Sequence, residues 1–224
     1  MKTFRKHLFL LLTLLGIAVY DAKADVVGEG WTFDTNEKEL VIDKSIEYSD
    51  AISYPWHRYR DQIESVVIKG GTVIGDYAFI ACSKLSSIYI SKEVTSIGSL
   101  AFANCGSIIS IRVAQGNTVY DSRNYCDAII ETSSNTLIRG CNTTIIPIDI
   151  TSIVKSAFSY CSLTSITIPE GVTSIGEGVF YNCTGELIVN CNIPNSAFRG
   201  SDFTEVTIGE NVTSIGGGAF YNCI

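Results

Sequence analysis

The chain has 224 residues, of which 46% are hydrophobic and only 17% charged, so a folded body with a sizeable core is expected and disorder is disfavoured. Its formal net charge of -7 argues against an electrostatic grip on nucleic acid or on anionic lipid. The two histidines, His7 and His57, leave little room for histidine-dependent catalysis or for a multi-histidine metal site. Most enzyme classes are therefore disfavoured at the outset.

Residues 1–24 have the pattern of a secretory signal peptide. Lys2 and Arg5 give a basic start, residues 8–19 are almost entirely apolar, and Ala22-Lys23-Ala24 supplies a small-x-small cleavage site. An apolar run of about 12 residues is shorter than the ~20 needed to cross a bilayer, which makes a membrane anchor the less favoured alternative. We expect an exported protein, on the cell surface or extracellular, with no stable transmembrane anchor.

The rest of the chain is dominated by an internal repeat. An isoleucine followed five residues later by a phenylalanine occurs six times. The phenylalanines are Phe79, Phe102, Phe158, Phe180, Phe198 and Phe220, which lie 23, 56, 22, 18 and 22 residues apart. A basic period of 22 to 23 residues, with one long insertion and one shortened unit, is typical of solenoids.

Each unit also contains a short segment of alternating apolar residues, such as 85–90, 163–168 and 203–208. Alternation with a period of two predicts a strand with one buried face. No single unit can bury that face, so we expect strands stacked at ~4.8 Å, inward columns of Leu, Ile and Phe, and one continuous core. The predicted fold class is a mainly β repeat solenoid, a curved rod of short strands and compact turns.

The unit at residues 163–183, Leu-Thr-Ser-Ile-Thr-Ile-Pro-Glu-Gly-Val-Thr-Ser-Ile-Gly-Glu-Gly-Val-Phe-Tyr-Asn-Cys, resembles the leucine-rich repeat of the BspA-like surface proteins. This treponemal-type class is common in Bacteroidetes. The resemblance covers about 63–224, and residues 25–62 resemble the segment that precedes the first repeat, here expected to be a small β-type N-terminal cap. An insertion at about 114–147, expected to hold a hairpin, also resembles one found in the family. The resemblance implies surface exposure and, in some members, adhesion.

Eight cysteines in an exported chain raise the question of disulfides. Five share one phase of the repeat, where parallel side chains at ~4.8 Å exceed the reach of a disulfide, so we interpret them as a ladder of buried free thiols. Cys126 and Cys141 lie in the insertion, and a hairpin centred between Ser133 and Ser134 would place them opposite each other. A disulfide there and two reduced core cysteines remain equal alternatives. No Cys-x-x-Cys pair favours a metal site.

Catalysis and cofactors have little support in the sequence. His57, the only histidine beyond residue 24, lies in a cluster ahead of the first repeat, where a role in capping the solenoid is favoured. The acidic residues fall at differing repeat phases, which favours solvated charges over a catalytic carboxylate pair. We expect no enzyme activity and no cofactor.

The outward strand positions are the natural binding surface of such a fold. Among them Tyr89 and Arg112 stand out, because Tyr and Arg often anchor interfaces. The insertion at 114–147, which we expect to project from the rod, is a second candidate surface through Tyr120, Arg123 and Tyr125. A plain solvated sheet face rich in Ser and Thr is the alternative.

Together these features predict an exported, non-catalytic leucine-rich-repeat protein that mediates adhesion or protein recognition. The resemblance implies that its partner is a host extracellular-matrix or cell-surface protein, or another bacterium. The alternative is a structural spacer or a fragment of a larger surface protein, which the end of the chain favours because it stops where another strand would begin.

Overall fold

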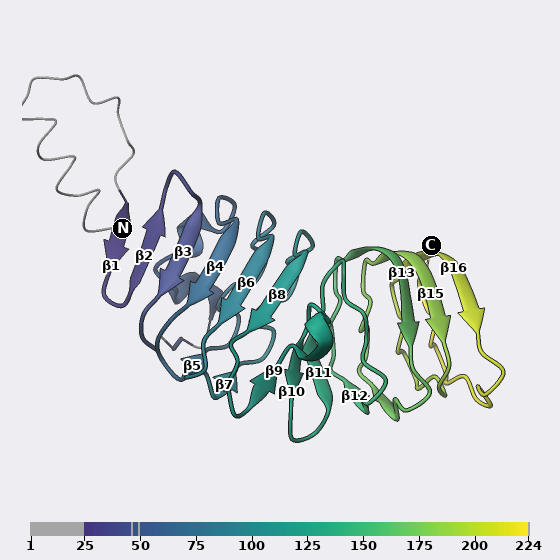
Figure 1. The fold of residues 1–224 in the computed structure, drawn as a ribbon. Coiled ribbons are helices and arrows are strands. Elements are labelled where there is room, and N and C mark those ends of the chain that lie inside the picture. The colour runs from purple at the N-terminus through teal and green to yellow at the C-terminus, as the bar shows by residue number, and fades with distance from the viewer. Residues whose placement is uncertain (1–24, 46, 49, 224) are drawn as a thin grey trace, which may run out of the picture.

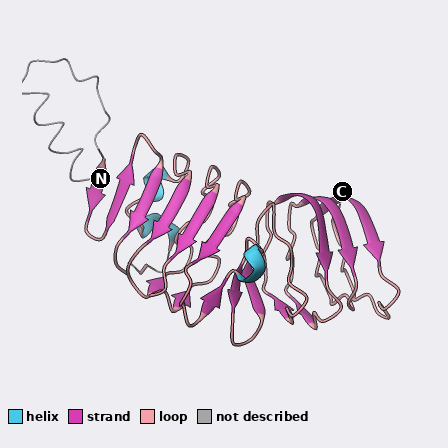
Figure 2. Ribbon diagram, in the orientation of Figure 1, coloured by secondary structure: helices cyan, strands magenta, loops and turns pink. Residues whose placement is uncertain are grey.

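The computed structural model describes residues 25–45, 47–48 and 50–223, so the predicted signal peptide at 1–24 lies outside the described residues. The chain forms an elongated row of stacked turns, with strands side by side and few, short helices (Figures 1 and 2). The predicted β solenoid with a small β-type N-terminal cap is confirmed.

The N-terminal half is built on a six-stranded sheet in the order β1-β2-β3-β4-β6-β8. Its strands are β1 (Val26–Gly28), β2 (Trp31–Asp34), β3 (Glu39–Ile42), β4 (Ser65–Ile68), β6 (Ser87–Ile90) and β8 (Ser110–Val113). The first three strands pair antiparallel and form the cap, and from β3 onward every pairing is parallel. The antiparallel hairpins thus give the first repeat strand a partner without a preceding repeat.

The cap also closes the end of the core with aromatic rings. Trp56 stacks on Phe79 with ring centroids 5.7 Å apart, and its indole N–H donates to the carbonyl of Ala78 at 2.8 Å. Two short 3-10 helices, η1 (Ala51–Ser53) and η2 (His57–Tyr59), flank Trp56. His57 lies beside it with Nε2 3.0 Å from the Arg60 guanidinium.

Opposite the main sheet, compact turns carry the repeated phenylalanines. The amides of Tyr77, Phe79 and Ala81 donate to carbonyls of the next turn at 3.1, 2.8 and 2.9 Å. The rings of Phe79 and Phe102 stack with centroids 5.0 Å apart. Short strands β5 (Val73–Ile74) and β7 (Ser96–Ile97) pair in parallel ahead of these turns. Backbone ladder and ring stack therefore repeat with the same period.

The turns need a left-handed backbone at two places, two residues before and two residues after each phenylalanine. Glycine or asparagine fills some of these places, and larger residues fill the others at a steric cost. The twelve positions are Tyr77, Ala81, Leu100, Asn104, Ser156, Tyr160, Gly178, Asn182, Ser196, Gly200, Gly218 and Asn222.

A second sheet runs through the insertion, in the order β14-β12-β11-β10-β9. Its strands are β9 (Tyr120–Asp121), β10 (Ile129–Glu131), β11 (Thr136–Arg139), β12 (Ser152–Ile153) and β14 (Ser174–Ile175). Strands β10 and β11 form an antiparallel hairpin, and β11 then pairs in parallel with β12. The short helix η3 (Arg123–Tyr125) connects β9 to the hairpin.

The C-terminal half ends in a parallel three-stranded sheet, β13-β15-β16. Its strands are β13 (Ser162–Ile168), β15 (Thr184–Val189) and β16 (Asp202–Ile208). Strands β8 and β13 belong to different sheets, and the insertion lies between them (Figure 1).

The expectation of one continuous core is wrong at the insertion. The buried side chains form two clusters, one under the first sheet and one under the last. Where the phenylalanine column breaks, buried Arg139 donates to the carbonyl of Cys105 at 3.0 Å and to that of Ser156 at 3.3 Å. A charged side chain joins the two halves here, because the insertion at about 114–147 lengthens the spacing from Phe102 to Phe158 to 56 residues and interrupts the regular stack of turns.

Candidate functional site

Two of the residues selected from the sequence lie side by side on the outward sheet face. Tyr89 in β6 is directly opposite Arg112 in β8, and Tyr89 is 43% exposed. Arg112 forms an ion pair with Asp127, and its guanidinium lies 5.8 Å from the ring centre of Tyr125, which is 82% exposed. We call Tyr89, Arg112, Tyr125 and Asp127 the tyrosine–arginine patch. It combines β6 and β8 with the insertion.

The other two candidates of the insertion do not project. Tyr120 is only 6% exposed, and its hydroxyl accepts a hydrogen bond from the amide of Ile97 at 3.0 Å. Burial raises the pKa of the Tyr120 phenol, although that hydrogen bond opposes the shift. Arg123 is mostly buried between Asp121 and Asp149, which pair with it at 2.7 and 2.5 Å. The interpretation of these two as an exposed surface is corrected, because the hairpin packs along the stack.

Cys126 and Cys141 are both buried free thiols. The predicted register holds near the hairpin turn, where Glu131 is opposite Thr136, but a bulge between Ile129 and Ile130 shifts the pairing beyond it. Cys126 consequently lies in the second core cluster and Cys141 in the first. Burial raises the pKa of the Cys126 thiol to about 11, so it is protonated at neutral pH.

The cysteines of the repeat face carbonyls of the preceding turn. The thiols of Cys105, Cys183 and Cys223 donate to carbonyls of Phe79, Phe158 and Phe198 at 3.0, 2.6 and 3.2 Å. In the described chain these cysteines are free, and all but Cys223 are buried. Cys105 and Cys183 therefore serve as small core groups whose thiol donors are satisfied.

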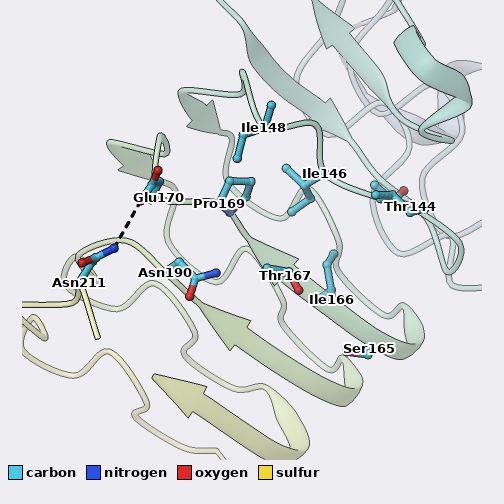
Figure 3. Close-up of a pocket in the computed structure, with 11 residues that line it drawn as sticks. Thr144, Ile146, Ile148, Ser165, Ile166, Thr167, Pro169, Glu170, Asn190 and Asn211 are labelled. Carbon is cyan, nitrogen blue, oxygen red and sulfur yellow. Dashed lines mark hydrogen bonds between the residues drawn. The ribbon is translucent and has the colours of Figure 1, made fainter. Parts of the chain in front are cut away.

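The structure also contains a groove of about 430 Å³ that the sequence reasoning missed. It lies between the loop at 144–148 and the middle of β13, where Ser165, Ile166 and Thr167 line it (Figure 3). Ile145 and Ile148 in the loop are 77% and 75% exposed. The apolar run Ile145-Ile146-Pro147-Ile148 within the insertion was the available signal, but its neighbour in space could not be read from it.

One end of the groove is polar. There Glu170 accepts a hydrogen bond from the Asn211 amide at 3.4 Å, and Asn190 lies alongside (Figure 3). A second depression of about 460 Å³ shares these three residues and continues to Asn192. The size is in the range of ordinary ligand sites, and the lining offers carboxylate, amide and hydroxyl groups beside bare aliphatic surface.

Within the described residues, no group of three or more His, Cys, Asp or Glu side chains could hold a metal ion. Nor does any helix in that part of the chain have the length and apolar character needed to span a membrane.

Comparison with known proteins agrees with the repeat pattern. The family model described as BspA type Leucine rich repeat region matches residues 52–185 and 132–224, with six copies. Among solved structures, the T. pallidum leucine rich repeat protein is similar with 17% identity and a TM-score of 0.45, covering 89% of both chains. A leucine rich cell surface protein from Faecalibacterium prausnitzii shares 16% identity, with a TM-score of 0.40 over 91% of this chain and 81% of that one. No curated protein sequence matched significantly.

Proposed function

Because this chain belongs to the BspA-type leucine-rich repeat family, we propose that it is an exported protein that recognises other proteins at the bacterial surface. Its partner is a host extracellular-matrix or cell-surface protein, or a protein on another bacterium. It acts by adhesion without catalysis or a cofactor. The resemblance described above supports this function, and export depends on the predicted signal peptide at 1–24.

The tyrosine–arginine patch is the observation that carries the proposal. Tyr89 and Arg112 are in register on neighbouring parallel strands, so the rigid sheet fixes their spacing. The ion pair with Asp127 and the ring of Tyr125 hold the Arg112 side chain in place, which lowers the entropy it loses on binding. Tyr and Arg in such preordered positions are typical anchors of protein interfaces.

The charge of the molecule also favours a protein partner. With a formal net charge of -7, the chain repels nucleic acid and anionic lipid at long range. The tyrosine–arginine patch offers instead a mixed surface of two phenols, one guanidinium and one carboxylate, which suits a protein surface carrying both polar and apolar groups.

The test is binding of purified residues 25–224 to immobilised fibronectin, fibrinogen, mucin glycans and whole neighbouring bacteria, measured by interferometry at physiological salt. The doubly substituted Tyr89→Ala, Arg112→Ala protein is expected to lose at least about tenfold in affinity. Tyr181→Ala is the matched control, since Tyr181 has the same 43% exposure but lies on a turn. Unchanged capture by the double variant would remove the patch as the site. Absence of any capture would leave the structural spacer as the function.

A further inference from the structure

Strands β8 and β13 each have one edge that faces the insertion and is not paired with another strand. Strand β8 is the last of its sheet, and β13 is the first of the next. The hydrogen-bonding groups on those two edges have no strand partner, and a strand edge left open is a template for another strand. The two edges are therefore the places where the sheet could accept an additional chain.

The edge of β8 is closed by side chains of the insertion. The amide of Ile111 donates to the Asp127 carboxylate at 3.3 Å, and that of Val113 donates to the Ser122 hydroxyl at 3.1 Å. Both donors that point away from β6 are satisfied, so this edge has no free donor to offer.

The edge of β13 is closed only at its two ends. At the start, the amide of Ser162 donates to the Asn142 side chain at 2.9 Å. Pro169 lies at the other end. It occupies the same repeat position as Ser91, which follows β6 and donates its amide to the carbonyl of Ile68 on the preceding strand at 3.0 Å. Proline has no backbone N–H, so this end of β13 has no donor that needs a partner.

Between these ends the edge is open. Ile168 accepts from the amide of Asn190 at 3.1 Å and so faces β15, and the alternation along a strand turns Ser165 and Thr167 to the other side. In the described part of the chain, the backbone N–H and C=O groups of Ser165 and Thr167 have no hydrogen-bond partner outside the β13–β15 ladder, and they point away from β15. Both residues line the groove, and so do the exposed Ile145 and Ile148 of the loop at 144–148. Figure 3 shows Ile148 on the side of the groove away from β13.

We propose that this groove binds an extended peptide segment of another protein, which adds as a strand to the edge of β13. Two residues with free donors and acceptors on one side, ~6.6 Å apart along the strand, are complementary to another extended backbone. The segment has apolar side chains at alternate positions, to cover Ile145 and Ile148, and no proline at the residues that pair. This inference rests on the proposed protein-binding function and assigns it a second, backbone-directed contact.

The regular repeat supplies a probe for this site. In the first sheet, residues 64–68 present carbonyls to β6, and Ser87 and Ser91 donate to Glu64 and Ile68. An acetylated and amidated peptide of residues 64–69, Glu-Ser-Val-Val-Ile-Lys, should therefore pair with β13 in the same way. Its Val66 amide would face Ser165, whereas its Val67 amide would face away.

Amide hydrogen exchange of the full exported chain, followed by NMR, is the direct test. In the free protein the amides of Ser165 and Thr167 are expected to exchange quickly, and those of Ile111 and Val113 slowly. The 64–69 peptide should slow Ser165 and Thr167 by about tenfold at saturation. The peptide N-methylated at Val66 should lose this effect, and the one N-methylated at Val67 should keep it. Slow exchange in the free protein, or no change with the unmodified peptide, would overturn the proposal.

Substitution at the edge gives a second readout. Thr167→Pro removes the free N–H while its side chain stays at an exposed position, and Thr167→Ala removes the hydroxyl but keeps the N–H. We expect the proline variant alone to lose peptide binding, with thermal unfolding confirming that both variants fold. Equal binding by both would overturn the edge contact. If whole-protein capture persists in that case, the proposed protein-binding function stands and only this inference fails.

Discussion

Strands β8 and β13 face the same insertion, yet one edge is closed and the other is open. Asp127 and Ser122 reach β8 because the chain returns beside that strand after leaving it. On the other side, Asn142 reaches only the first residue of β13, and the loop at 144–148 runs past the rest. One inserted segment can thus complete the sheet it follows while leaving the next sheet with a usable edge.

The largest expected effect concerns the phenylalanine columns on the two sides of the insertion. Phe180 packs between Phe158 and Phe198, with centroids 4.9 and 6.0 Å away, so Phe180→Ala should cost about 3 to 5 kcal/mol in urea unfolding. The ring of Phe102 stacks only on Phe79 among the described residues, so Phe102→Ala should lower the free energy of unfolding by less. Equal losses would show that the break in the column has no energetic consequence.

The next effect concerns the connection between the halves. Arg139→Ala removes hydrogen bonds to Cys105 and Ser159 across the break and should cost about 2 to 3 kcal/mol. Calorimetry should then resolve two unfolding transitions, one for each core cluster. The control is Arg199→Ala, which breaks an exposed ion pair with Glu177 and should change stability by at most about 0.5 kcal/mol. A single sharp transition in the Arg139 variant would contradict this role.

A smaller effect is expected from opening the edge of β8, which would make it resemble the edge of β13. Asp127→Ala leaves the amide of Ile111 without an acceptor and should cost about 1 kcal/mol, with faster hydrogen exchange at Ile111. Asp149→Ala, which removes an exposed carboxylate paired with Arg123, serves as the control and should leave Ile111 unchanged. If Ile111 stays protected without Asp127, the side chain does not close the edge.

The smallest expected effect is a pH dependence of the insertion. Burial raises the pKa of the Asp121 carboxyl, but hydrogen bonds from Arg123 and Thr132 outweigh it and hold the pKa below its ordinary value. The ionised Asp121 carboxylate therefore contributes fully to stability above about pH 4, the pKa of an unfolded aspartate. This contribution is lost as the pH falls through the folded-state pKa of Asp121. Acid unfolding curves should show this loss in the native protein and not in Asp121→Asn. Identical curves would remove Asp121 as a cause.

Much of the fold follows from the sequence because a repeat multiplies each weak signal. Six phenylalanines at related positions predict the turns, and the alternation in 85–90 and 163–168 predicts strands that the structure contains. The register of Tyr89 opposite Arg112 follows from the 23-residue period between Phe79 and Phe102. A local sequence pattern is sufficient to predict strand pairing where residues that are close in space belong to consecutive repeats.

The same reasoning fails where one residue decides the pairing. The bulge at Ile129 and Ile130 separates Cys126 from Cys141, and no sequence pattern marks it. Burial of Tyr120 and Arg123 depends on which side of the hairpin packs against the stack. The open edge of β13 depends on the path of the loop at 144–148, which is a property of tertiary structure alone.

The division of the core into two clusters has a mechanical consequence. In a stacked protein each turn is held only by its neighbours, so a tensile load is carried in series and the weakest junction yields first. In this chain we expect that junction to be the one bridged by Arg139, because hydrogen bonds replace the stacked rings there. Under shear, the molecule would extend in two steps, and the half that still holds its ligand could remain folded after the other has opened.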